Sequence, residues 1–126
     1  MSDRARIISV IPVYNGERFI RATLDSLAAQ TLRPDRVIVL DDASTDGTSQ
    51  LVETYEPLDC ELIRSEKNEG LFFNFNKALS YATECDHLHY ICADDVLLTG
   101  FMERMTAALT DAPAPSFSYC LPEFID

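Results

Sequence analysis

The sequence predicts an α/β fold in which helices flank a mostly parallel sheet. Two runs of mainly apolar, largely β-branched residues, 7–13 and 36–40, are typical of strands that are buried on both faces. Segments with helical periodicity alternate with the strand-like runs, which indicates parallel strands joined by helical crossovers. The chain has 126 residues, of which 47% are hydrophobic and 25% charged, as expected for a single globular domain.

The first predicted strand, residues 7–13, reads IISVIPV. After the turn residues Asn15-Gly16, residues 17–29 form a predicted helix. Its apolar residues share one helical face: Ile20, Leu24, Leu27 and Ala28. A second buried strand covers residues 36–40. It leads into a polar loop, 41–47, that is rich in helix-capping residue types, and a helix to about Tyr55 should follow.

The second half repeats this alternation. A short third strand includes residues 62–63, and residues 68–70 form a turn. The next helix should bury one apolar face, made of Leu71, Phe75, Ala78, Leu79 and Ala82. Residues 88–93 are predicted as the fourth strand and residues 100–109 as a helix. Beyond two prolines, residues 117–121 have the composition of a fifth strand.

Charge and cysteine content restrict the function classes. Ten basic and 21 acidic side chains give a net charge of −11, and no basic face remains for a phosphate backbone, so we expect no nucleic-acid partner. The four cysteines form no C-x-x-C pair, which favours free thiols in a reducing cytosol. No run is long and apolar enough for a membrane span. We therefore expect a cytoplasmic protein, with a peripheral membrane position left open.

Two aspartate pairs follow predicted strands, Asp41-Asp42 after the second and Asp94-Asp95 after the fourth. Ligands of open parallel sheets bind at the carboxyl ends of the strands, so both pairs should lie at the binding edge. Paired carboxylates repel one another unless something offsets them, and hard cations prefer their oxygens. An alternative reading is that each aspartate only caps the following helix.

Other motifs fit the chain less well. The spacing from Asp42 to Glu53 matches a calcium-binding EF-hand loop, but such a loop needs an entering helix where residues 36–40 predict a strand. A phospho-accepting receiver domain would need an acidic pair after the first strand and a late lysine, and the chain has neither. The four glycines lie too far apart for a phosphate-binding loop.

An ordered set of motifs resembles the donor-binding half of the family 2 glycosyltransferases, which have the GT-A fold. The segments that carry the resemblance cover roughly residues 7–110: Ser9–Asn15, Leu24–Leu27, Gln30-Thr31, Val39–Thr48, Asn68–Leu71, Asn76–Leu79 and Ala93–Asp95. The resemblance implies a Rossmann-like sheet. It also implies that residues 1–126 form a single nucleotide-sugar-binding domain, truncated before the acceptor-binding half.

The resemblance assigns roles to individual residues. Pro12, Val13 and Tyr14 would line the nucleobase pocket, where Tyr14 offers a flat apolar surface. Asp42 would accept the imide N–H of uracil or a related base. Asp94 would lie near the ribose or the diphosphate, and Asp95 would bind Mg²⁺ or Mn²⁺.

The chain also departs from the family pattern. Cys92 stands where the fullest form of the metal motif has aspartate, so Asp95 would be the sole side-chain ligand. Phe75 stands where many members have arginine, which removes one phosphate partner. The family's catalytic base belongs to the acceptor-binding half, so we expect it beyond residue 126 and assign no catalytic residue here.

Together these readings predict an inverting, metal-dependent glycosyltransferase that uses a nucleotide-diphosphate sugar, with a UDP-sugar favoured. The acceptor would be an undefined glycan, lipid or protein. The fragment alone should bind the donor without being an efficient catalyst. The alternative is a non-catalytic nucleotide- or metal-binding module that retains the fold. Surface left uncovered by the truncation would also permit a homodimer.

Overall fold

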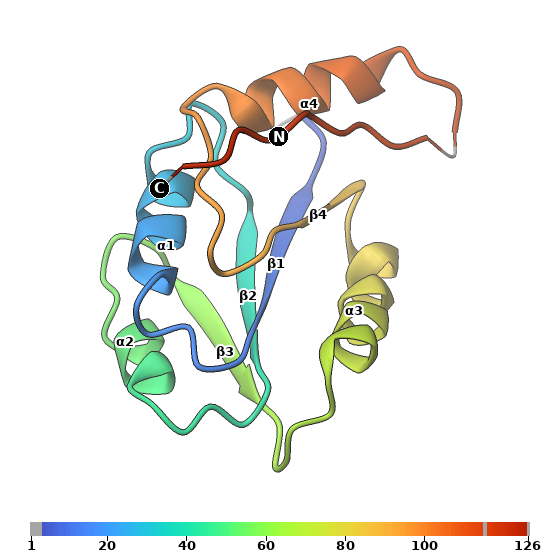
Figure 1. Ribbon diagram of the computed structural model, residues 1–126. Helices are drawn as coiled ribbons and strands as arrows, with labels where there is room; N and C mark the ends of the chain where they lie inside the picture. Colours follow the sequence, from blue (N-terminus) through green and yellow to red (C-terminus); the bar gives the residue numbers. More distant parts are fainter. Residues whose placement is uncertain (1–3, 115, 126) are drawn as a thin grey trace.

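The computed structural model describes residues 4–114 and 116–125 (Figure 1). Strands and helices alternate along these residues, as the sequence predicts. In chain order the elements are β1 (Ile7–Val13), α1 (Ile20–Ala28), β2 (Arg36–Asp41), α2 (Thr48–Glu53), β3 (Cys60–Arg64), α3 (Leu71–Leu79), the 3-10 helix η1 (Ser80–Glu84), β4 (His87–Tyr90) and α4 (Phe101–Thr110).

The four strands form one sheet in the order β3-β2-β1-β4, and every neighbouring pair is parallel. This confirms the predicted parallel α/β architecture. All seven residues of β1 are buried, because the strand has a neighbour on each side and is covered on both faces. Ile8 lies opposite Arg36 and Val13 opposite Asp41, so β1 and β2 end at the same edge.

Helices cover both faces of the sheet, with α1 and α2 on one side and α3 on the other (Figure 1). Side chains alternate between the faces along each strand. Ile11, Val13, Val37 and Val39 pack in the core that also contains residues of α1 and α2. Ile8, Val10, Ile38 and Leu40 pack on the other face with Ala78 of α3. Residues 41 and 42 must therefore point to opposite faces.

The predicted helix after the 68–70 turn forms, but its predicted apolar face is wrong. Of that face, Ala78 is buried, while Leu71, Phe75 and Leu79 are exposed, and Ala82 belongs to η1 and is also exposed. The helix instead buries Asn74 together with Ala78. Periodicity identified the helix correctly but could not show which of its faces meets the sheet.

The predicted fifth strand at 117–121 does not form. The segment after α4 runs back beside that helix (Figure 1), and Ser118 Oγ donates to the carbonyl of Met105 at 3.3 Å. Phe117, Tyr119 and Leu121 are largely exposed there, because no strand pairs with the segment. Within the described ranges, no helix has the length and apolar content needed to cross a membrane.

Candidate functional site

The turn that follows β1 is fixed to the loop that follows β2. The backbone N–H of Asn15 donates to Ser44 Oγ and that of Gly16 to Thr48 Oγ1, both at 2.9 Å. Asn15 has a positive φ of 50°. A Cβ on Gly16 would clash with Val13 Cγ2, which favours glycine at this position.

The neighbouring residues Asp41 and Asp42 have different surroundings. Asp41 is fully buried on the α2 side of the sheet. It accepts hydrogen bonds from Ser44 and from Ser49 Oγ, and Arg64 Nη1 lies 3.2 Å from its carboxylate. These partners satisfy Asp41 within the fold, so it serves the structure of this loop rather than ligand binding.

Asp42 points to the opposite face, toward the turn before α3. Its carboxylate accepts the backbone N–H of Glu69 at 2.8 Å and that of Gly70 at 2.9 Å. Burial acts to raise the pKa of Asp42, but hydrogen bonds from Glu69, Asn74 and Gly70 outweigh it, so the pKa lies below its usual range. The carboxylate is therefore ionised at neutral pH.

A pocket of about 220 Å³ opens at this carboxyl edge of the sheet. It is lined by the sequence-predicted base-binding residues together with residues of the α3 turn: Pro12, Val13, Tyr14, Asp42, Asn68, Gly70, Leu71 and Asn74. Tyr14 is 51% exposed, which leaves its ring free to cover a planar ligand. The sequence does not predict that the last four residues line the pocket, although the Asn68-Glu69-Gly70 motif marks the turn before α3.

Asn74 is a buried amide that lines the same pocket. Its Nδ2 donates to the Gly70 carbonyl at 2.9 Å, whereas its Oδ1 has no hydrogen-bond partner. The turn that holds Asp42 is thus fixed from two directions, by the carboxylate of Asp42 and by the amide of Asn74.

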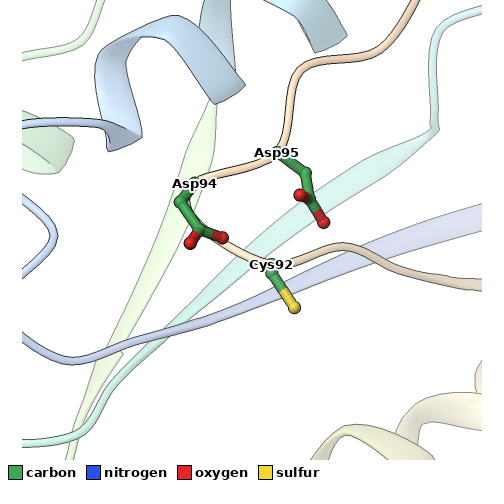
Figure 2. Close-up of side chains that lie close together, drawn as sticks. All are labelled: Cys92, Asp94 and Asp95. Carbon is green, nitrogen blue, oxygen red and sulfur yellow. The ribbon is translucent and has the colours of Figure 1, made fainter. Parts of the chain in front are cut away.

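The segment after β4 brings three potential metal ligands together. The sulfur of Cys92 and one carboxylate oxygen each of Asp94 and Asp95 all lie within 4.8 Å of one another (Figure 2). The Asp95 N–H donates to the Cys92 carbonyl at 3.2 Å, which closes a tight turn. Burial, Asp95 and Asp94 all raise the pKa of the Cys92 thiol. A divalent cation fits this donor set because its charge offsets the two carboxylates.

Helix α1 fixes the turn that carries Cys92, Asp94 and Asp95. Thr23 is fully buried and its hydroxyl lies 2.9 Å from the Ala93 carbonyl and 2.7 Å from that of Asp95. A Cβ on Gly16 would lie 3.6 Å from Ala93 Cβ, so the turn after β1 adjoins this turn. The pocket therefore lies next to the cluster of potential metal ligands formed by Cys92, Asp94 and Asp95.

Two alternatives from the sequence are wrong. The helices that follow the aspartate pairs begin only at Thr48 and Phe101, so neither pair caps a helix. The EF-hand alternative fails because residues 36–41 form a strand, not an entering helix. Phe75, which stands where the resemblance places an arginine in many members, packs its ring against Tyr90 with 5.0 Å between centroids.

Several curated proteins are similar to this chain in sequence. Among curated proteins, the chain is 26% identical over 110 residues to glycosyltransferase GlyA of Streptococcus pneumoniae, covering 86% of this chain and 16% of GlyA. It is 28% identical over 98 residues to the uncharacterized glycosyltransferase EpsJ of Bacillus subtilis, covering 77% of this chain and 28% of EpsJ. The chain thus spans well under half the length of these relatives.

Solved structures of other proteins match the fold of this chain. TarS 1–349 of S. aureus in complex with UDP matches with a TM-score of 0.73 and 32% identity, over 82% of this chain and 32% of that one. The mannosyltransferase PcManGT of Pyrobaculum calidifontis, in complex with GDP-Man and Mn²⁺, matches with a TM-score of 0.75 and 29% identity, over 87% and 34%. The family model of glycosyl transferase family 2 matches residues 9–123. The four-stranded parallel sheet is accordingly of the GT-A type, and the chain belongs to glycosyl transferase family 2.

Proposed function

We propose that residues 1–126 form the donor-binding portion of an inverting glycosyltransferase that transfers a sugar from a UDP-sugar to a glycan, lipid or protein acceptor. One observation carries the proposal: the pocket that contains Tyr14 and Asp42 adjoins a turn with three potential metal ligands. A nucleoside diphosphate has a planar base and an anionic diphosphate, and this arrangement offers a partner for each.

The pocket suits a base with an N–H donor. Asp42 is ionised and already accepts two backbone N–H groups, yet a carboxylate offers about four acceptor positions. A remaining lone pair would accept the imide N–H of uracil, while the Tyr14 ring covers a face of the base. A base without that donor would cover the remaining lone pair of Asp42 without supplying a hydrogen bond, so the pocket would disfavour it.

The cluster of Cys92, Asp94 and Asp95 suits the diphosphate group of the donor. The chain has a net charge of −11, so an anionic donor would be repelled without a cation to hold it. We propose that Asp95 binds Mg²⁺ or Mn²⁺ and that Asp94 lies near the ribose or the diphosphate. When bound, the ion would stabilise the negative charge that develops on the leaving nucleoside diphosphate.

The relatives support this assignment, since TarS was solved with UDP and PcManGT with GDP-Man and Mn²⁺. The general base of an inverting transfer must reach the acceptor hydroxyl. We propose that it comes from an acceptor-binding half outside these residues.

Calorimetry with UDP and UMP, each with and without Mn²⁺, tests the proposed function. Manganese should strengthen UDP binding by at least about tenfold, since a diphosphate chelates the ion, and should change UMP binding much less. Binding of UDP that does not depend on manganese would contradict the proposal, and so would equal manganese effects on UDP and UMP.

A further inference from the structure

We propose that Cys92 is a ligand of the metal ion and that its sulfur makes this centre favour Mn²⁺ and other thiophilic divalent ions over Mg²⁺. This inference rests on the proposed function, because it concerns the ion that would hold the donor diphosphate. It also changes the expectation from the sequence, in which Asp95 was the sole side-chain ligand.

The geometry brings the sulfur within reach of the ion. Ligands that bind one ion at about 2.0 to 2.3 Å can lie at most about 4.6 Å apart. The sulfur of Cys92 and the oxygens of Asp94 and Asp95 lie within 4.8 Å of one another, which is close to that limit. In Figure 2 the three side chains project from a single short turn.

The turn is held in place before any ion binds. Thr23 Oγ1 lies within hydrogen-bond distance of the carbonyls of Ala93 and Asp95, and the Asp95 N–H donates to the carbonyl of Cys92. Cys92 is partly buried, whereas both aspartates are exposed. The sulfur therefore lies on the inner side of the cluster, with the carboxylates on the solvent side. The Cys92 thiol is free of any disulfide.

Donor chemistry then determines which ion binds. Mg²⁺ takes oxygen ligands in near-ideal octahedral geometry and loses water reluctantly. Thiolate is a soft ligand that favours later transition metals, while carboxylates suit Mg²⁺ and Mn²⁺ alike. One sulfur with two carboxylates thus penalises Mg²⁺ most. Coordination replaces the S–H bond with a sulfur–metal bond and releases the thiol proton to the buffer.

Absorption spectroscopy with Co²⁺ tests the sulfur directly. The 126-residue chain would be titrated with Co²⁺ under a non-thiol reductant, with and without UDP, while the thiolate-to-cobalt charge-transfer band is recorded in the near ultraviolet. The band should appear in the wild type and be lost in Cys92→Ser. Cys120→Ser is the matched control, because Cys120 is exposed and outside the cluster, and it should keep the band.

Competition between Mn²⁺ and Mg²⁺, followed by electron paramagnetic resonance of free Mn²⁺, tests the preference. Cys92→Asp should lower the ratio of Mn²⁺ to Mg²⁺ affinity by about tenfold, because it replaces the soft sulfur with an oxygen that suits both ions. The inference is overturned if Cys92→Ser keeps the band, or if the wild type and Cys92→Asp show the same ratio of Mn²⁺ to Mg²⁺ affinity. Manganese-dependent UDP binding alongside either result would leave the proposed function standing. A band without any UDP binding would support the sulfur ligand and contradict that function.

Discussion

Asp42 illustrates how one side chain can both shape a pocket and line it. Its carboxylate orders the turn before α3 by accepting the N–H groups of Glu69 and Gly70, and the same carboxylate lines the pocket. Asp41, one residue earlier, is instead buried among Ser49 and Arg64 on the other face. The sequence motif Asp-Asp does not distinguish the two residues, but strand alternation does.

Asp42→Ala should therefore weaken UDP binding more than it weakens binding of UDP methylated at the imide nitrogen. The methylated base has no N–H to donate, so it cannot lose a contact with Asp42. The hydrogen bond to this charged group corresponds to about 1.5 to 3 kcal/mol. Calorimetry of both ligands with both proteins gives the difference. An equal loss for the two ligands would argue against the base contact and would point to collapse of the turn instead.

His89 gives a second prediction at the residue scale. Its Nδ1 lies 2.8 Å from Ser9 Oγ, and its ring packs against Phe101 of α4. Burial lowers the pKa of His89 to about 4, from an ordinary 6.5. The unfolded chain therefore takes up this proton first as the pH falls, and stability is lost between pH 6.5 and pH 4.

Urea denaturation at pH 7.5 and pH 4.5 measures this loss. The wild type should lose about 2 to 3 kcal/mol more of its unfolding free energy over that interval than His89→Gln, because the variant lacks the group. Comparing the two proteins cancels the acidic side chains that also titrate. Equal losses in the two proteins would show that His89 is not held neutral by the fold.

At the scale of elements, α1 links the core to the site. Its apolar side chains Ile20, Leu24 and Leu27 are fully buried, and its buried polar groups reach the segment between β4 and α4. Thr23 of α1 lies against the carbonyls of Ala93 and Asp95. Gln30, just beyond the end of α1, donates to the Leu98 carbonyl and accepts the Met102 N–H. Hence α1 orders the segment that carries Cys92, Asp94 and Asp95.

Thr23→Val should lower the affinity for Mn²⁺ by about tenfold, as expected for a group that positions ligands without touching the ion. Valine preserves the shape, so the change removes mainly the hydroxyl. Ser26→Ala is the matched control, because Ser26 Oγ donates only to the Thr23 carbonyl within α1. Electron paramagnetic resonance of Mn²⁺ would measure both affinities. Comparable losses in the two variants would assign the effect to general destabilisation of α1.

The elements also show what the sequence could and could not predict. Strands β1 and β2 were predicted within a residue, because continuous burial on both faces leaves an unbroken apolar run. The prediction of the buried face of α3 was wrong, because the apolar residues of this helix lie on more than one side and Asn74 occupies a buried position. The prediction of a fifth strand was wrong, because apolar composition alone does not supply a pairing partner. The nearness of the Cys92 sulfur to the Asp95 carboxylate was not predicted, because it arises from the turn after β4.

In the molecule as a whole, the net charge opposes self-association, whereas exposed apolar surface favours it. A net charge of −11 keeps copies of the chain apart, yet α3 exposes several large apolar residues, with Phe72 83% exposed. The homodimer expected from the sequence stays a prediction. Light scattering should give twice the 14.1 kDa of one chain, and Phe72→Ser with Phe73→Ser should restore the monomer. A monomer at every wild-type concentration would contradict it.

We propose that a divalent cation at the turn after β4 joins this acidic protein to an anionic nucleotide. Calorimetry of UDP binding to the wild type and to Asp95→Asn, each with and without Mn²⁺, tests this role of the cation. The wild type should require manganese for strong binding, and Asp95→Asn should lose most of this requirement together with the added affinity. Strong UDP binding without manganese, or a manganese effect that persists unchanged in Asp95→Asn, would show that the cation does not hold the nucleotide at this turn.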